Sequence, residues 1–327
     1  MSTQSISVII CAYAEERWVD LVAAIESVRR QSVPCLEIVV AIDHNPALLE
    51  RVRSDLPGVV AVENREPRGL SGARNSGLAV AQATIVAFLD DDAMAAPDWL
   101  EHLSAGYEDP AVLGVGGAIE PHWSGDRPRW FPEEFDWVVG CTYRGMPTRI
   151  APVRNLIGAN MSFRREVFEA IGGFRSGIGR VGTRPVGCEE TELCIRALQR
   201  WPDRIFCYEP RARVYHRVPT LRASSSYFRS RCYAEGRSKA LVSRLVGAGA
   251  GLASERAYTF QVLPRGVVGG LTDLVRHRDP SGLARASAIA AGLAITTAGY
   301  LTGVVMSGLS SRAASAAQPE GGIAGAA

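Results

Sequence analysis

The chain has 327 residues, 47% of them hydrophobic, which is enough for one large α/β domain with an appendage and excludes an intrinsically disordered chain. Its 36 Lys and Arg nearly balance its 34 Asp and Glu, so the overall charge gives no support for nucleic-acid binding. The 7 cysteines include no C-x-x-C pair, so no disulfide framework or zinc knuckle is recognisable and a reduced, cytosol-facing catalytic part is favoured.

Short runs rich in Val and Ile alternate with helical patterns in the first part of the chain. The expected strands are "SISVII", "LEIVVAI", "VVAV" and "TIVAFL", and the expected helices cover about 17–30, 46–55 and 72–82. Near-continuous apolar strands that alternate with helices predict a mainly parallel sheet, covered on both faces. Ligands of such sheets bind beyond the carboxyl ends of the strands, where we find Ala12, Tyr13, Asp43 and the run Asp90–Asp92.

Three aspartates in a row, Asp90, Asp91 and Asp92, follow the strand "TIVAFL". Carboxylates this close repel one another, so a cation is expected beside them. Mg²⁺ or Mn²⁺, which prefers oxygen ligands and often shares them with phosphates, would suit the cluster. The alternative is a solvated acidic turn that caps a helix starting near Pro97.

The segment "REPRGLSGARNSGL" connects two of these strands. Gly69 and Gly72 frame a turn before a helix, and Arg74 lies in the first turn of that helix. An arginine at a helix start is well placed to meet an anionic phosphate. The alternative for Arg74 is a surface ion pair.

The regular alternation stops after about Leu113, where "VLGVGGAI" predicts one more strand. The segment "HWSGDRPRWFPEEFDW" has no clean period and suggests a loop over a site or a surface that faces a membrane. We place Trp130 from this segment, and Asn160 from the strand and helix pattern "NLIGANMSFRREVFEAIGGF", on the acceptor side. The run "GIGRVG" at 177–182 lacks the strand and helix of a dinucleotide fingerprint and is expected to be a flexible loop.

Two further acid–base candidates follow. Glu189 and Glu190 open the helical pattern "CEETELCIRALQR", and one of them could act as a general base toward a hydroxyl group. Because neighbours on a helix point about 100° apart, only one can face a given acceptor, and we favour Glu190 over Glu189. The alternative is a first turn stabilised by the helix dipole. His216, at the end of the strand "ARVYH", could be a third metal ligand or an ordinary polar residue.

The C-terminal third is basic and then apolar. A helix over 224–245 carries Arg229, Arg231, Arg237, Lys239 and Arg244, which could hold anionic headgroups or be a solvated face. The run 286–311 has no charged residue and could cross a bilayer, lie at its surface or pack on the protein. The arginines before it favour that flank as cytoplasmic. The tail "AASAAQPEGGIAGAA" is expected to be disordered.

The order of these motifs resembles the inverting family-two glycosyltransferases of the GT-A fold. The matching pieces are "SVIICAYAEE", "VVAIDHN", "GLSGARNSGL", "VAFLDDDA", "GANMSFRREVFEAIGGF", "CEETELCIRALQR" and "VYHRVP", between Ser5 and Pro219. The resemblance implies a Rossmann-like, mostly parallel mixed sheet and the transfer of a sugar from a nucleotide-sugar donor with Mg²⁺ or Mn²⁺. The segment "SYFRSRCYAEGRSKALVSR" also resembles prokaryotic members that act on lipid-linked saccharides.

The resemblance also implies roles for single residues. Glu190 falls where the family usually has an aspartate as catalytic base, which leaves the choice between Glu189 and Glu190 open. Asp90 and Asp92 match the D-x-D pair for ribose and metal, with His216 as a further metal ligand. The residues implied in nucleotide-sugar binding are Ala12, Tyr13, Glu15, Asp43, Arg74, Asp90 and Asp91.

We therefore expect four regions: a GT-A catalytic domain at 1–220, a basic and apolar helical region at 221–283, a membrane-associated or transmembrane helix at 284–311, and a disordered tail at 312–327. The expected activity is metal-dependent, inverting transfer from a nucleotide sugar, with UDP-hexose favoured, to a lipid-linked saccharide or cell-envelope glycan. The expected place is the cytoplasmic face of the cell membrane, without a nucleic-acid partner. A non-catalytic nucleotide-sugar-binding partner at a membrane is the alternative.

Overall fold

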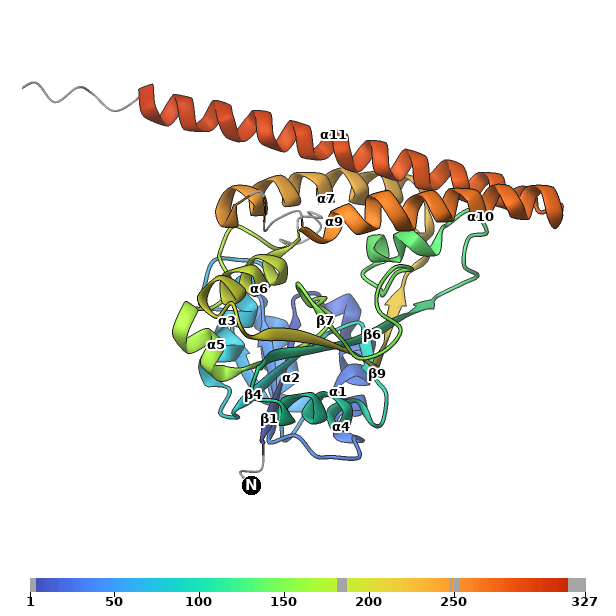
Figure 1. The fold of residues 1–327 in the computed structure, drawn as a ribbon. Helices are drawn as coiled ribbons and strands as arrows, with labels where there is room; N and C mark the ends of the chain where they lie inside the picture. Colours follow the sequence, from blue (N-terminus) through green and yellow to red (C-terminus); the bar gives the residue numbers. More distant parts are fainter. Residues whose placement is uncertain (1–3, 181–186, 248, 250–252, 317–327) are drawn as a thin grey trace, which may run out of the picture.

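The computed structural model describes residues 4–180, 187–247, 249 and 253–316 (Figure 1). Its N-terminal part is built on a 9-stranded mixed sheet with the order β3-β2-β1-β4-β8-β6-β9-β5, while β7 pairs with β9. The first four strands are parallel to one another, as the alternation of strands and helices predicts. They are β1 (Ile6–Ala12), β2 (Glu37–Ile42), β3 (Val60–Glu63) and β4 (Ile85–Asp90).

Helices cover both faces of this sheet. On one face the apolar residues of α1 (Trp18–Arg29), α2 (Pro46–Asp55) and α4 (Trp99–Ala105) pack against the strands in one core. On the other face, α5 (Arg165–Ile171), α6 (Glu189–Arg200) and the end of α3 (Leu70–Val80) share a second core with the aromatic ring of Phe88. The strands are buried on both sides, which explains why they read as nearly continuous apolar runs.

The mixed half of the sheet brings the later strands back to the aspartate cluster. β8 (Asn160–Arg164) runs antiparallel to β4, and β6 (Val112–Trp123) runs parallel to β9 (Ile205–Val218). The sequence predicts two strands where β9 is one, because the β6–β9 register shift between Gly117 and Ala118 absorbs the residues around Pro210. The three-residue β5 (Ala93–Ala95), which no period predicts, pairs with the end of β9.

The segment at 122–137 is only partly irregular. Strand β6 continues to Trp123, and a 3₁₀ helix, η3 (Glu133–Val139), follows after a Pro-containing loop. The short β7 (Ala151–Val153) then returns to the sheet. Of "GIGRVG", residues 177–180 are described and the rest of that predicted loop lies outside the described residues.

A layer of C-terminal helices lies against the opposite end of the domain from the N-terminus (Figure 1). It consists of α7 (Ser225–Val246), α9 (Ala253–Ala257), the π-helix η5 (Tyr258–Val262), α10 (Leu263–Arg276) and α11 (Pro280–Ala316). The apolar run expected at 284–311 is thus part of a longer helix. Within the described residues, one helix, over Pro280–Met306, is long and apolar enough to cross a bilayer. The predicted disordered tail falls mainly outside the described residues.

Glycines let α11 approach α7 closely. A Cβ atom added at Gly236 of α7 would lie 2.0 Å from the Thr296 carbonyl oxygen, and one added at Gly299 of α11 would lie 2.2 Å from the Tyr233 carbonyl oxygen. Any larger residue would force the two backbones apart. The first part of α11 is therefore docked on the protein along α7, and the predicted helical regions beyond residue 220 pack together as one layer.

Candidate active site

The strand ends converge as the topology predicts. The parallel pairing of β1 with β4 sets Cys11 beside Asp90, and the antiparallel pairing of β5 with β9 sets Ala93 opposite His216. His216 comes from the far end of the sheet, yet this register carries its ring to Asp92, where Nε2 lies 3.1 Å from Oδ1. Residues more than 100 positions apart thus meet at one edge of the sheet.

Cationic side chains of the protein itself surround the aspartates. Arg17 Nη1 lies 2.7 Å from Asp91 Oδ1 and 3.3 Å from Asp92 Oδ2. Arg222 Nη2 lies 3.5 Å from the same Asp92 oxygen. Two arginines and the imidazole of His216 therefore supply positive charge beside the aspartates. The sequence did not identify any of these three side chains as a counter-charge of the cluster.

The pKa values of the clustered groups are shifted in opposite directions. Burial, together with the neighbouring Asp92 carboxylate, raises the pKa of Asp91 to about 7, and Arg17 opposes this rise. Burial alone would raise the pKa of Asp92 as well, but the neighbouring cations, above all His216, lower it far below the usual carboxyl range. Burial opposes a charge on His216, yet the Asp92 carboxylate raises the pKa of the imidazole to about 10. Asp92 and His216 are therefore a charged pair at neutral pH.

The same residues fit a divalent cation. Asp90, Asp92 and His216 each offer one ligand atom, and these atoms all lie within 4.8 Å of one another. Two carboxylate oxygens suit Mg²⁺ or Mn²⁺, and an imidazole nitrogen suits Mn²⁺. Asp90 is partly exposed toward a cavity, with Arg74 3.8 Å away, whereas His216 must release its proton to act as a ligand. The donor set is thus compatible with the expected metal.

Arg74 is buried and is not part of a surface ion pair. Its side chain is 2% exposed, and its Nη1 donates to Glu189 Oε1 at 2.7 Å. Nη2 donates to the Gly158 carbonyl at 3.2 Å, and the aromatic ring of Phe174 lies under the guanidinium. Arg74 still lines the cavity together with Asp90, so its positive charge reaches the place where phosphates are expected.

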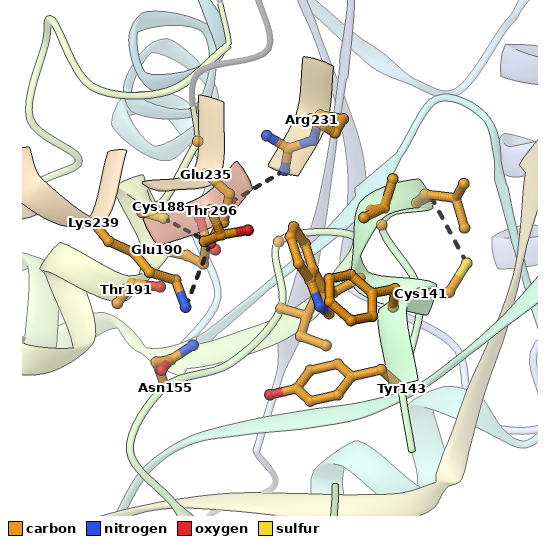
Figure 2. A pocket seen from close by; sticks show the side chains of 18 of the residues that line it. Cys141, Tyr143, Asn155, Cys188, Glu190, Thr191, Arg231, Glu235, Lys239 and Thr296 are labelled. Carbon is orange, nitrogen blue, oxygen red and sulfur yellow. Dashed lines mark hydrogen bonds and ion pairs between the residues drawn. The ribbon is translucent and has the colours of Figure 1, made fainter. Parts of the chain in front are cut away.

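The structure treats the two adjacent glutamates differently. Glu189 is buried and held by Arg74, whereas Glu190 makes no ion pair with any residue that the structure describes. Both line the cavity, and Figure 2 shows Glu190 on its wall. Burial and the nearby Glu189 carboxylate raise the pKa of Glu190 to about 8, with Arg74 opposing the rise. Glu190 is therefore the carboxyl group of the two without an ion-pair partner among the described residues, and its pKa of about 8 lies close to the physiological range.

The residues expected around a nucleoside lie at the outer part of this edge. Ala12 is buried at the end of β1, Tyr13 is 36% exposed, and Glu15 is exposed in a short 3₁₀ turn. The Asp43 carboxylate accepts hydrogen bonds from the Gly69 backbone N–H at 3.0 Å and from Asn64 at 2.7 Å. Asp43 thereby holds the turn that leads into α3.

Two expected acceptor-side residues lie away from the cavity. Asn160 is completely buried within the sheet, where its side chain accepts from Trp99 Nε1 at 2.8 Å and donates to the Ala118 and Ala212 carbonyls. Trp130 packs against the rings of Phe131 and Phe228. Neither of them is among the cavity-lining residues of the described chain, so the structure does not bring them to the proposed acceptor.

A cavity of about 390 Å³ extends from the aspartate edge to the C-terminal helices. At one end it is lined by Arg74, Asp90, Glu189 and His216, and at the other by side chains of α7, η5 and α11. The basic helix α7 is two-sided: Arg231 and Lys239 line the cavity, and the other three cations expected on it, Arg229, Arg237 and Arg244, are exposed.

One further cation was missed. Arg180 lines the cavity and makes no ion pair or side-chain hydrogen bond with any described residue. Burial, and then the positive charges of Arg222 and Arg231, lower the pKa of Arg180. Such an unpaired, crowded guanidinium is suited to an anionic ligand. The local sequence "GIGRVG" does not identify this arginine, because its role depends on residues that are distant in sequence and close to it in the fold.

This arrangement agrees with comparisons to known proteins. The model of the glycosyl transferase family 2 matches residues 7–172. A glucosyl-dolichyl phosphate glucuronosyltransferase of Haloferax volcanii is 36% identical, with 92% of this chain and 96% of the relative covered. The succinoglycan biosynthesis protein ExoM of Rhizobium meliloti is 25% identical, with 72% of this chain and 74% of the relative covered.

A solved structure has a similar fold. The mannosyltransferase PcManGT of Pyrobaculum calidifontis, in complex with GDP-Man and Mn²⁺, superimposes with a TM-score of 0.58 at 18% identity. The match covers 91% of this chain and 87% of that one, which supports the GT-A architecture predicted from the sequence. The chain belongs to glycosyl transferase family 2 and is a glycosyltransferase of the GT-A fold.

Proposed function

We propose that this glycosyltransferase is metal-dependent and inverting, and that it transfers a sugar from a nucleotide diphosphate sugar to a hydroxyl group of a lipid-linked saccharide. The observation that carries the proposal is the cavity itself. Its lining includes Asp90 and His216 of the ligand set that Asp92 completes, and also Glu190, a carboxyl group that makes no ion pair with the described residues. A donor bound at the first group would present its sugar toward the second.

The leaving group in this reaction is a nucleoside diphosphate, which accumulates negative charge as the glycosidic bond breaks. A divalent cation held by Asp90, Asp92 and His216 would supply Lewis-acid stabilisation of that charge. The chain's own cations add to it, because Arg74 and Arg180 line the same cavity. Preorganised positive groups at the site of developing charge are worth most where water is excluded.

Glu190 is proposed as the general base. It would take the proton from the attacking hydroxyl as that oxygen bonds to the anomeric carbon on the face opposite the leaving diphosphate, which inverts the configuration. Its raised pKa of about 8 suits this role, since a base near the working pH combines availability with proton affinity. Glu189 is proposed to position Arg74, which it contacts at 2.7 Å.

The Haloferax volcanii relative, whose name combines glucosyl-dolichyl phosphate with a glucuronosyl group, supports the choice of substrate classes. On that basis we propose a UDP-linked hexose or hexuronic acid as donor and a polyprenyl-phosphate-linked sugar as acceptor. An acceptor of this kind is confined to a bilayer. The enzyme is therefore proposed to work at the cytoplasmic face of the cell membrane.

The helical layer offers a surface for that contact. Val268, Leu271 and Val275 of α10 are spaced at i, i+3 and i+7 and are 62%, 43% and 76% exposed, which makes an apolar stripe on one helix face. Exposed Arg276 and Arg278 lie at the end of the stripe. An apolar helix face flanked by arginines suits the interface of an anionic bilayer.

The proposal is tested by incubating the full chain with radiolabelled UDP-glucose, UDP-glucuronic acid or GDP-mannose, with a short-chain polyprenyl phosphate glucose as acceptor. Assays run with Mn²⁺, with Mg²⁺ and with EDTA. Transfer from a UDP sugar that stops with EDTA, with an inverted anomeric centre by NMR, is the expected result. Nucleotide binding without transfer to any acceptor would favour the non-catalytic alternative instead.

A further inference from the structure

The C-terminal helices contribute a charged wall to the cavity. Arg231, Glu235 and Lys239 are spaced at i, i+4 and i+8 along α7, so their side chains lie on one helix face. All three line the cavity, and Figure 2 shows them on the same side as Glu190. Lys239 is the only lysine among the 327 residues. These three residues lie beyond residues 7–172, the part of the chain that matches the family model.

The charges of this wall form a continuous network. Lys239 Nζ lies 2.9 Å from Glu255 Oε1 and 4.0 Å from Glu235 Oε1. Arg231 Nη2 lies 3.4 Å from Glu235 Oε2, and Arg154 Nη1 lies 2.9 Å from Glu255 Oε2. Helix α7, helix α9 and the segment after β7 thus meet through five charged side chains, each between 11% and 25% exposed.

Stability alone gives no reason for such a network. Buried ion pairs generally contribute no more than well-packed apolar side chains of similar volume, because desolvation of both charges offsets their attraction. These side chains also line a cavity, so their charged groups are within reach of its contents. A ligand rich in hydroxyl groups can use both the carboxylates and the cations.

The opposite wall is aromatic. Trp137 Nε1 donates to the Tyr258 hydroxyl at 3.0 Å, and the rings of Tyr143 and Tyr258 pack edge to face with centroids 5.4 Å apart. Figure 2 shows Tyr143 across the cavity from Lys239 and Asn155. A pyranose ring has hydroxyl groups around its rim and an apolar C–H face, so a polar wall opposite an aromatic wall matches both.

The network also lies directly beside Glu190. The Cys188 thiol donates to Glu235 Oε1 at 3.4 Å, and Cys188 precedes the two glutamates that open α6. On the other side of the glutamate pair, Glu189 contacts Arg74, which faces Asp90. Glu190 therefore stands between the end of the cavity proposed for the donor and this charged wall.

We infer that the charged wall of Arg231, Glu235, Lys239, Glu255 and Arg154 is the acceptor-sugar subsite, which binds the pyranose of the lipid-linked acceptor and turns one hydroxyl toward Glu190. The inference rests on the proposed function and names the part of the chain that selects the acceptor. The catalytic domain would bind the nucleotide sugar, and the helical extension would recognise the sugar that receives the transfer.

Kinetics of wall variants test the inference. The double variant Lys239→Met/Glu255→Gln removes this ion pair and keeps the net charge, with Arg154 losing its contact to Glu255. Glu235→Gln removes one negative charge from a second member of the wall. The KM for polyprenyl phosphate glucose should rise about 10- to 100-fold, since hydrogen bonds between the charged side chains of the wall and the hydroxyl groups of the acceptor sugar are lost. The KM for the donor and the thermal stabilisation by UDP with Mn²⁺ should stay within twofold.

A surface ion pair provides the matched control. Arg53 and Glu50 lie 2.7 Å apart on α2 and are 51% and 71% exposed. The variant Arg53→Met/Glu50→Gln removes the same kinds of charge and should leave both KM values unchanged. An acceptor KM within twofold of wild type in both wall variants, with active wild-type enzyme, would overturn the inference and leave the proposed function intact.

The single lysine allows a measurement that needs no turnover. A sample with [¹⁵N]lysine gives one backbone amide resonance, that of Lys239, without further assignment. Titration with polyprenyl phosphate glucose should move this resonance in a saturable manner, even if no transfer occurs. A resonance that stays in place at saturating acceptor would contradict the subsite, whereas a shift without transfer would contradict only the proposed function.

Discussion

The guanidinium of Arg74 donates to the carboxylate of Glu189 at 2.7 Å, across 115 positions of sequence. This contact joins α3 to the first turn of α6, and it engages Glu189, one of the two adjacent glutamates that open α6. Glu190 has no such partner among the described residues. The pair thus gives the two carboxyl groups different chemistry.

Glu190→Gln should abolish transfer and spare donor binding. Loss of a general base typically lowers kcat by about 10²- to 10⁴-fold, while the isosteric amide keeps the shape of the site. The measurement is single-turnover transfer beside UDP titration in the presence of Mn²⁺. Near-normal turnover in this variant would move the role to another group.

Glu189→Gln should lower the free energy of unfolding. It leaves the buried charge of Arg74 without its carboxylate, which typically costs about 3–5 kcal/mol when a buried pair is broken. Urea unfolding followed by circular dichroism gives the free energy of unfolding. Unchanged stability together with lost activity would instead identify Glu189 as the base.

The rate should depend on pH through Glu190. A carboxyl group with a pKa raised to about 8 is protonated below that pH and cannot accept a proton there. The value of kcat/KM should therefore rise about tenfold per pH unit and level off above about 8, because kcat/KM reports ionisations of the free enzyme. A flat profile between pH 6 and 9, at constant metal saturation, would argue against this assignment.

Asp92→Asn should remove metal-dependent nucleotide binding. In the wild type, Mn²⁺ with UDP at about 100 times its Kd should add about 2.7 kcal/mol to the free energy of unfolding. The comparison is made within each protein, with and without ligand, because the change also removes the partner of His216. Equal stabilisation of the variant would show that Asp92 is not needed to hold the metal and diphosphate.

The apolar stripe on α10 should carry membrane binding. Val268→Asp/Val275→Asp places two charges on this face and should weaken co-sedimentation with phosphatidylglycerol vesicles by about 10- to 100-fold. Val19→Asp, on the 77% exposed site of α1, is the matched control. Unchanged vesicle binding by the double variant would indicate that α11, and not α10, makes the membrane contact.

Close packing of α11 on α7 should be sensitive to a single methyl group. Gly236→Ala brings a Cβ atom against the Thr296 carbonyl and should lower the free energy of unfolding by about 1–3 kcal/mol. Gly125→Ala, where an added Cβ meets nothing within 4 Å, is the control. Equal thermal stability of the two variants would mean that α11 is not held against α7 in solution.

Much of the fold is visible in local sequence. Helix α2 begins and ends where it is predicted, because Asn45 caps it by accepting from the Leu48 N–H and Pro46 fixes its first turn. The aspartates at the end of β4 follow from the strand pattern as well. By contrast, β5 has three residues and no period, and it exists because β9 pairs with it.

The counter-charges of the site are not visible in this way. Arg17 meets Asp91 from 74 positions away, and the approach of Arg222 to Asp92 depends on the path of the chain after β9. In a chain with many arginines, no local pattern distinguishes these two from the solvated ones. The burial of Asn160 is hidden from the sequence for a related reason, since its position in the middle of the sheet depends on the pairing of β8 with β4 and β6.

The order of the chain after β9 has an evolutionary consequence. His216 closes the ligand set of the donor end, Arg222 follows within six residues, and α7 then begins the opposite wall of the cavity. On the proposed roles, the donor-end ligands precede this short connection and four of the five residues of the charged wall follow it, with Arg154 before it. Exchange of the exons or gene segments that encode the region beyond this connection would create an enzyme with the same sugar nucleotide and a new recipient.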